Sequence, residues 1–379
     1  MSEYMILRLI WWAVLGVLLI GIAVMDGFDL GTAILLPVIG RTDMDRRIMI
    51  NTVGPVWEGN QVWLILGAGA IFAAWPALYA VAFSGFYLAM LLLLLSLILR
   101  PVGFKFRGKL EDTRWRTTWD TALFIAGLVP ALVFGVAFGN ALKGVPFRFD
   151  DTLRMTYAGT LFDLFNPFAL LCGVVSVVMI VMHGAAWLGC KTEAPVRERA
   201  RKVGVVAALA LVVLFVLGGV WVARLDGYVV QSFAGMDAPS NPLTKQVGHV
   251  DGALLGNYGL VPATMAVPAL GIAGAVLAAL LLALGRMRVL AFCCSGVSIA
   301  GVIATAGVSL FPFLLPSSLD PNSSLTVWDA SSSETTLLVM TVVTAVLLPV
   351  VLAYTAFIYR VLRGPVTAAT IEAGGHESY

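Results

Sequence analysis

Three acidic residues stand in stretches of the chain that are otherwise strongly apolar. Asp26 and Asp29 lie three residues apart in MDGFDLG at 25–31, so they share one face if this segment is helical. Glu58 lies in WEGNQVW at 57–63, where two amides accompany it. Carboxyl groups among hydrogen-bonding neighbours can take up and release protons, so these three acids are candidate members of a proton path.

Other charged residues have simpler interpretations, and these stay open for Glu58 as well. Glu58 and Asp120 fall where helices are expected to begin, and a helix dipole stabilises an acid in its first turn. Arg100 falls at the expected end of a helix, just before Pro101, where it can extend to the membrane interface or pair with Asp29 or Asp120. Arg100 and Asp120 are therefore interpreted as structural charges.

The sequence contains few residues that could bind a redox cofactor. His183, His249 and His376 are its only histidines, and it has no CxxCH haem-attachment motif. His183 falls at the expected inner end of a helix with no obvious partner, and we interpret it as a polar residue at a helix edge. If the chain belongs to a haem enzyme, the haems must lie mainly in another subunit.

The tryptophans near the expected helix ends have two interpretations. Trp57 and Trp63 flank the polar segment that contains Glu58, and Trp75, Trp115 and Trp119 lie close to other helix ends. Tryptophan is typical of membrane interfaces and of helix packing, so cofactor contact is the less expected role for each of them.

The elements that must position these residues are membrane-spanning helices. The chain is 60% hydrophobic and 12% charged, whereas soluble domains are about a quarter charged. A bilayer core is crossed by about 20 apolar residues in a helix, and the apolar runs here are continuous rather than alternating. The sequence therefore predicts an all-α polytopic membrane protein and excludes a soluble fold. About nine helices are expected, at residues 5–39, 56–75, 77–99, 118–140, 164–184, 203–224, 261–284, 289–313 and 334–360.

The loop charges predict the orientation. With the N-terminus outside, 18 of the 24 Lys and Arg residues fall in inner segments. The six outer ones are Arg8, Lys143, Arg148, Arg154, Arg224 and Lys245. This asymmetry favours an N-out, C-in topology, and sorting of charge by topology does not suggest nucleic-acid binding. No outer or inner segment is long enough for a further domain, so residues 1–379 are treated as one membrane domain.

Several motifs are similar to those of a known family. Residues 27–104 contain GFDLGTAILLPVIGR, RRIMINTVGPVWEGNQVWLILGAGAIFAAWPALYA and FSGFYLAMLLLLLSLILRPVGF, and later segments include EDTRWRTTWD, NPFALLCGVVSV, FPFLLPSS and LTVWDASSS. This pattern resembles subunit II of the cytochrome bd-type ubiquinol oxidases, including the cyanide-insensitive branch, along nearly the whole chain.

The resemblance implies a fold and an assembly in the bacterial plasma (inner) membrane. It implies two four-helix bundles plus one peripheral helix, paired with a subunit I that carries haem b and haem d, and a small single-helix subunit. Such a complex oxidises quinol, reduces O2 to water and takes protons from the cytoplasm, which makes turnover electrogenic. This chain would not be catalytic alone, but it would support subunit I and could retain a structural quinone.

The resemblance also assigns roles to individual residues. Glu58 matches the family acid at the start of the second helix, where relatives often have Asp, and it is expected to pass protons towards the haem pocket. Asp26 and Asp29 match a GFD-type motif that lines or supports the path. Trp63 falls where relatives line the O2 route, and Trp57 lies beside it, at that route or at the subunit interface.

One alternative comes from a different functional class. The interruption of the first long apolar run around 26–31 is also typical of the broken helices with which ion-coupled secondary transporters bind substrates near the midplane. A transporter would be active as this chain alone, without a haem-bearing partner.

Overall fold

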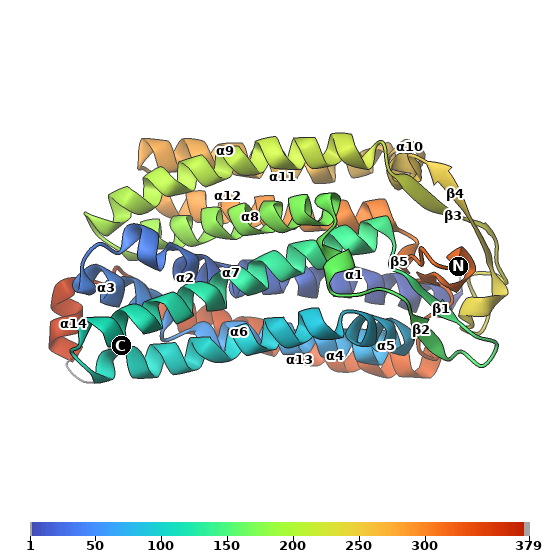
Figure 1. The fold of residues 1–379 in the computed structure, drawn as a ribbon, viewed down its shortest axis with the longest axis horizontal. Helices are drawn as coiled ribbons and strands as arrows, with labels where there is room; N and C mark the ends of the chain where they lie inside the picture. The colour runs from blue at the N-terminus through green and yellow to red at the C-terminus, as the bar shows by residue number, and fades with distance from the viewer. Residues whose placement is uncertain (1, 375–379) are drawn as a thin grey trace.

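The long apolar runs form helices that lie side by side along one axis of the computed structural model, which describes residues 2–374 (Figure 1). The helices that run along this axis are α1 (Glu3–Met25), α2 (Gly27–Ile39), α4 (Trp57–Ala74), α5 (Pro76–Gly85), α6 (Tyr87–Phe106), α7 (Thr113–Lys143), α8 (Pro167–Lys191), α9 (Val196–Val222), α11 (Ala266–Leu284), α12 (Arg288–Leu310) and α13 (Glu334–Val361). Within the described residues, eight helical stretches are long and apolar enough to cross a membrane, and α5 is a shorter apolar helix.

Two of the predicted helices are broken into two parts. The first apolar run bends at Asp26, which separates α1 from α2, and the third bends at Phe86, which separates α5 from α6. The prediction that Pro101 ends the third helix is wrong, because α6 continues through it to Phe106. Neighbouring helices in a membrane can supply partners for the backbone group that a proline leaves unpaired.

The helices form two bundles, as the resemblance implies. The first contains α1–α2, α4, α5–α6 and α7, linked through the pairs α1 with α4, α4 with α5, α6 with α7 and α7 with α2. The second is a closed ring of α8, α9, α11 and α12. Contacts of α8 with α7 and α2, and of α12 with α1, join the bundles, while α13 packs mainly on α1 and α4 and is peripheral.

Short elements cover both ends of the bundle. Helix α3 (Asp43–Val53) begins with a capping box in which Thr42 and Asp45 exchange side-chain to backbone hydrogen bonds. The strands form three two-stranded antiparallel ribbons. They are β1 (Phe147–Phe149), β2 (Met155–Tyr157), β3 (Asp226–Ser232), β4 (Gln246–Asp251), β5 (Phe313–Leu315) and β6 (Leu325–Thr326). The remaining helices are η1 (Arg107–Lys109), η2 (Phe162–Phe165), η3 (Pro242–Thr244), η4 (Ala253–Leu255), α10 (Gly256–Leu260), η5 (Pro262–Met265), η6 (Pro321–Ser323) and α14 (Ala368–Gly374).

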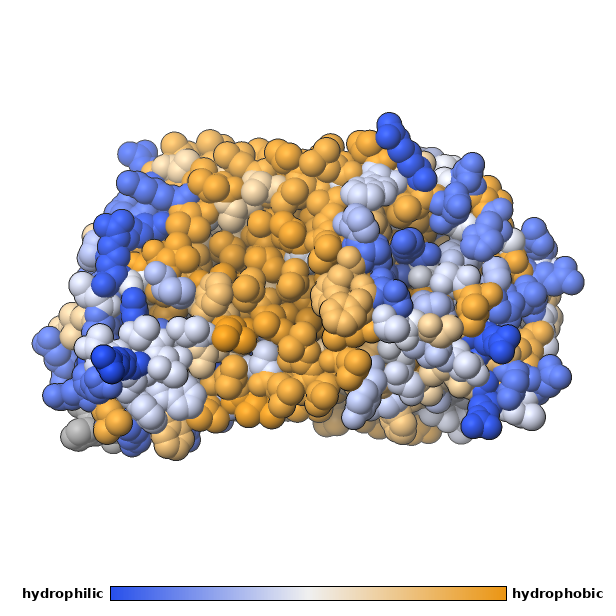
Figure 2. All heavy atoms as spheres, viewed as in Figure 1, coloured by the Kyte–Doolittle hydropathy of each residue, from blue (hydrophilic) through white to orange (hydrophobic). Residues whose placement is uncertain are grey.

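The surface carries the pattern of a membrane protein. Figure 2 shows a wide apolar zone across the middle of the molecule, with hydrophilic side chains gathered at both ends. The two ends of the chain lie at opposite ends of the long axis (Figure 1). The end that holds α3 and α14 corresponds to the predicted inner side (Figure 1).

Candidate functional site

The break between α1 and α2 places a buried ion pair inside the first bundle. Asp26 occupies the turn itself, and its carboxylate lies 2.6 Å from Nη1 of Arg100 on α6. The two side chains are 2% and 0% exposed, respectively. The expectation that Arg100 pairs with Asp29 or Asp120 is therefore wrong: because α6 continues past it, Arg100 lies inside the helix and reaches Asp26.

A second chain of hydrogen bonds runs from Asp29 to the peripheral helix. The Asn60 amide on α4 donates to Asp29 Oδ2 at 2.9 Å, and the Tyr359 hydroxyl on α13 donates to Asn60 Oδ1 at 2.7 Å. Asp29 lies one helical turn after Asp26, so both acids belong to one polar cluster. A carboxyl, an amide and a phenol in series are groups that can relay protons when water joins them.

Several buried polar atoms of this cluster have no hydrogen-bond partner among the described residues. They are Asp29 Oδ1, Thr32 Oγ1, Trp57 Nε1, Arg100 Nε and Arg100 Nη2. Buried polar groups are normally satisfied by protein or by ordered water, so the cluster can bind water. The Arg100 guanidinium also lies over the Trp57 ring, 5.6 Å from its centroid, which adds a cation–π attraction.

Glu58 lies on the same turn of α4 but points away from the cluster. Trp57 and Asn60 are buried and face inward, whereas Glu58 is exposed, together with the apolar side chains of Val62 and Ile65 further along the helix. Glu58 is a first-turn residue of α4, so its stabilisation by the helix dipole remains a valid interpretation.

The two predicted tryptophans are both buried, in different surroundings. Trp57 lies between Arg100 and Phe104, whose ring centroid is 5.6 Å from its own. Trp63 is one and a half turns further along α4 and packs in an apolar cluster with Leu18 and Ile22 of α1. Trp63 therefore lines the α1–α4 contact rather than the polar cluster.

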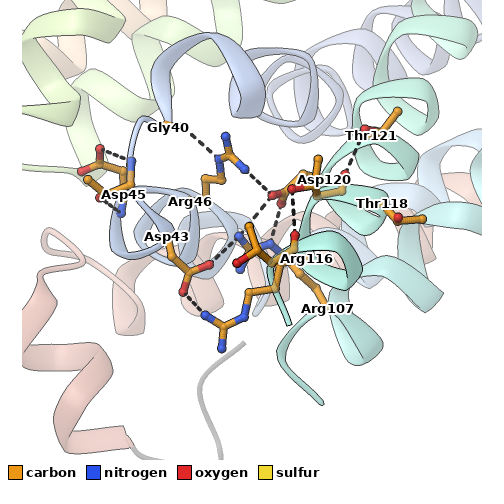
Figure 3. Close-up of polar contacts among 12 residues, drawn as sticks. Gly40, Asp43, Asp45, Arg46, Arg107, Arg116, Thr118, Asp120 and Thr121 are labelled. Atoms are coloured by element: carbon orange, nitrogen blue, oxygen red, sulfur yellow. Dashed lines mark hydrogen bonds and ion pairs between the residues drawn. The ribbon is translucent and has the colours of Figure 1, made fainter. Parts of the chain in front are cut away.

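Asp120 belongs to a separate charged network at the predicted inner end (Figure 3). It accepts hydrogen bonds from Arg107 Nε at 2.5 Å and from Arg46 Nη1 at 2.6 Å. Arg107 and Arg116 both bind Asp43, each at 2.8 Å, so α3, η1 and α7 are held together. The interpretation of Asp120 as a first-turn acid is wrong, because α7 begins seven residues earlier than Asp120, at Thr113.

A neighbouring contact joins α3 to α9. Arg199 Nη2 lies 3.0 Å from Asp45 Oδ2. Burial alone would raise the pKa of the Asp45 carboxyl, but hydrogen bonds from Arg199 and Thr42 outweigh this effect and lower the pKa. The α3 segment is thus fixed by charges on both sides, and it leads directly into the turn of α4 that carries Trp57 and Glu58.

An apolar cavity of about 480 Å³ lies mainly within the second bundle and is bordered by α1, α2 and α7. Aromatic and aliphatic side chains such as Phe134 and Phe168 dominate its wall. Its few polar groups include the Tyr258 hydroxyl, which lies 3.2 Å from Ser309 Oγ near the end that holds the strands. A long apolar molecule with a small polar group fits this lining.

Comparison with known proteins identifies the family. The family model described as "Cytochrome bd terminal oxidase subunit II" matches residues 7–362. The chain belongs to this family. It is 52% identical over 382 residues to "Cytochrome bd-I ubiquinol oxidase subunit 2" of Escherichia coli strain K12 and 50% identical over 379 residues to "Probable cytochrome oxidase subunit 2" of Haemophilus influenzae, with all of each chain covered. "Cytochrome bd ubiquinol oxidase subunit 2" of Bacillus subtilis is 31% identical over 93% of this chain and 95% of its own length.

A solved structure supports the fold. "The structure of bd oxidase from Geobacillus thermodenitrificans" matches with a TM-score of 0.68 at 19% identity, over 94% of this chain and 98% of that one. As a cytochrome bd oxidase subunit II, the protein is a subunit of a terminal oxidase complex, is a multi-pass protein of the bacterial inner membrane, and has a subunit I as its partner. The family is a haem-containing oxidase.

The described histidines do not fit the role of haem ligands in this subunit II. His183 is fully buried and bonds through both ring nitrogens, to Ser295 and to the Val24 carbonyl, so the interpretation of a polar helix edge without a partner is wrong. His249 is exposed on β4, and its ring lies beside Tyr228. His376 lies outside the described residues.

Sequence reasoning missed two members of the polar cluster. They are Asn60, which the sequence shows only as one of two amides beside Glu58, and Tyr359, which lies 299 residues further along the chain. The polar opening of α4 was a usable signal for Asn60, because an amide in a membrane helix needs a partner. Tyr359 offered no such signal, since tyrosine near the end of a membrane helix is ordinary.

Proposed function

We propose that this chain is the haem-free half of a quinol:O2 oxidoreductase, in which it supports subunit I and contributes a proton path and an O2 route. In this proposal subunit I holds haem b and haem d, which supply electron transfer from quinol and the reduction of O2 to water. Protons enter from the cytoplasm, so turnover is electrogenic, and a small single-helix subunit completes the complex.

The observation that supports this proposal most directly is the exposed carboxylate of Glu58 on a helix of the membrane domain. A charged side chain at membrane depth costs roughly 2.5–3.5 kcal/mol or more when it faces lipid. Glu58 shares its exposed face of α4 with Val62 and Ile65, which are 44% and 68% exposed. We therefore infer that subunit I covers this face and that Glu58 lies at the boundary between the subunits.

The buried cluster behind Glu58 supplies the next proton-carrying groups of the proposed path. Asn60 follows Glu58 on the same turn and binds both Asp29 and Tyr359. Ordered water bound to Asp29 Oδ1 and to the free Arg100 N–H groups would connect these side chains. The Asp26 carboxyl group is occupied by its ion pair with Arg100, whereas Asp29 Oδ1 has no partner among the described residues, so we assign proton exchange to Asp29.

Two apolar features have complementary proposed roles. Trp63, packed against Leu18 and Ile22, borders an apolar contact suited to the passage of O2, whereas Trp57 is better placed to support Arg100. The cavity of about 480 Å³ would hold the isoprenoid chain of a structural quinone, and the Tyr258 hydroxyl, which donates to the Thr305 carbonyl at 3.2 Å, would turn its proton to a quinone oxygen.

Replacement of Glu58 in the assembled complex tests the proton path. We expect E58Q to slow quinol-dependent O2 consumption by about tenfold or more, because proton delivery loses a carboxyl group. E58D should be mild, since it keeps the carboxyl group. Haem content, read from the reduced-minus-oxidised spectrum of the purified complex, should be the same in both variants.

Glu334 provides a matched control. It is also an exposed first-turn acid of a long helix, α13, so E334Q removes the same helix-dipole interaction at a place remote from the cluster. Full turnover of E334Q with slow turnover of E58Q supports the path. Full turnover of an assembled, haem-replete E58Q complex would refute it.

A further inference from the structure

His183 joins the two helix bundles at the break in the first apolar run. It lies on α8, and its Nε2 is 2.9 Å from the carbonyl oxygen of Val24, near the end of α1. Its Nδ1 is 2.8 Å from Ser295 Oγ on α12. Val24 precedes Asp26 by two residues, so the hydrogen bond from α8 ends directly beside the turn that carries the buried acid.

The partners of His183 determine which of its nitrogens carries the proton. The Val24 carbonyl can only accept, so Nε2 must donate to it. In a neutral imidazole Nδ1 then accepts, and the Ser295 hydroxyl can donate either to Nδ1 or to the Phe292 carbonyl, which lies 2.7 Å away. The contact of His183 with the break is therefore a donated hydrogen bond, which another donor of similar length can reproduce.

The backbones of α2 and α8 are also in direct contact beside this hydrogen bond. A Cβ added to Gly184 would lie 2.5 Å from the carbonyl carbon of Gly31, and one added to Gly27 would lie 2.8 Å from Ile180 Cδ1. Small residues of this kind let membrane helices approach closely. Helix α8 thus forms a fixed surface against which the beginning of α2 is held, and His183 extends this contact to the end of α1.

We propose that His183 is a positioning residue for the buried acids of the first bundle. A break in a membrane helix leaves backbone groups that neighbouring helices must satisfy. By donating to the Val24 carbonyl, His183 holds the last turn of α1 and so sets where Asp26 meets Arg100. Because α2 starts from this turn, the same contact sets the direction of Asp29 towards its hydrogen-bond partner.

The proposal rests on the proposed proton path only for its effect on turnover, and its geometric part can be tested separately. In the purified complex with its haem-bearing partner, H183L removes the donor, whereas H183Q keeps an amide N–H that reaches the same carbonyl. H249L removes an exposed histidine from β4 and is the matched control.

We expect H183L to lower quinol-dependent O2 consumption about tenfold and to change its pH profile, because small displacements of proton-transfer groups have large effects on rate. H183Q should stay within about twofold of the wild type, and H249L should be unchanged.

The second measurement is the thermal unfolding midpoint of D26N in the wild-type and H183L backgrounds. If His183 positions Asp26 against Arg100, D26N lowers the midpoint less when His183 is already replaced. If H183L does not assemble, H183N serves in its place, since its amide is one methylene shorter than that of H183Q.

Each outcome has a definite meaning. Additive midpoint shifts, or equal turnover of H183Q and H183L (or of H183Q and H183N), overturn the positioning role. Full turnover of D29N instead overturns the proton path, while coupled midpoint shifts would still support the positioning of Asp26.

Discussion

Removal of the Asp26 carboxylate leaves the Arg100 guanidinium without its counter-ion at a site closed to solvent. The two groups meet at 2.6 Å, and Arg100 Nε and Nη2 have no other partner among the described residues. Breaking a buried ion pair from one side typically costs about 3–5 kcal/mol, because an uncompensated charge stays buried. The Trp57 ring and the nearby Asp29 carboxyl offset part of this cost, so we expect D26N to destabilise the protein by about 2–4 kcal/mol.

Thermal unfolding of the purified complex measures this effect. A change of 1 kcal/mol corresponds to about 2–4 °C for domains of 150–250 residues, so D26N should lower the unfolding midpoint by about 4–16 °C. The double variant D26N/R100L should lie closer to the wild type than D26N does, because it leaves no buried charge of the pair. Glu198, which pairs with Arg201 and is about half exposed, provides the control: E198Q should change the stability by less than about 1 kcal/mol.

Two results would contradict this reasoning. If D26N shifts the midpoint no more than E198Q, Arg100 is solvated or paired in a way that the ion-pair geometry does not describe. If the double variant is less stable than D26N, the guanidinium contributes through its contact with Trp57 rather than through its charge, and the cation–π attraction becomes the dominant interaction of Arg100.

Three further changes test other parts of the fold. G184A places a methyl group 2.5 Å from the α2 backbone, so it should destabilise the α2–α8 contact by about 1–3 kcal/mol, measured by the yield and thermal midpoint of the complex. Because the pKa of Asp45 is lowered in the folded protein, its pair with Arg199 stabilises above the ordinary Asp value of about 3.9, and this stabilisation is lost as the pH falls through the lower folded value. D45N should therefore lower the free energy of unfolding at pH 7 by roughly 1 kcal/mol, seen as a lower thermal midpoint. It should also remove the loss of stability that the Asp45–Arg199 pair causes at acidic pH. Y258F should reduce quinone retained after purification, measured by extraction, if the apolar cavity holds a quinone through the Tyr258 hydroxyl; unchanged quinone content would exclude that contact.

The helices and their grouping were largely predictable from the sequence. Apolar runs of membrane length define the helices because each must satisfy its own backbone within the bilayer. The acid and glycine residues at 25–31 correctly indicated an interruption of the first run. The short helix α3 was missed, although the threonine and aspartate of its capping box, Thr42 and Asp45, stand three residues apart in the sequence and were a usable signal.

The partners within the candidate site were much less predictable. The sequence places Arg100 at the end of its helix because Pro101 follows it, and only the structure reveals that α6 continues through Pro101 and that Asp26 is the partner. The prediction that His183 is a polar residue at a helix edge is wrong for a related reason. A lone polar residue near an expected helix end looks like a surface residue, and its true burial depends on helices that are far apart in the sequence.

The buried acids and the arginine of the candidate site all lie in one of the two bundles. Arg100, Asp26, Asp29 and Asn60 all lie in the first bundle, on the side where Glu58 reaches the surface. The second bundle surrounds most of the apolar cavity, whose wall has few polar groups. The buried charged pair and its neighbours thus lie in the first bundle, whereas the cavity that would hold an apolar molecule is lined mainly by apolar side chains of the second. If this separation matters for function, a new carboxyl group in the cavity wall, as in V302E, should lower the amount of quinone retained by the purified complex. Removal of the quinone from the wild-type complex should leave the hydrogen bonds of Asp26 and Asp29 unchanged.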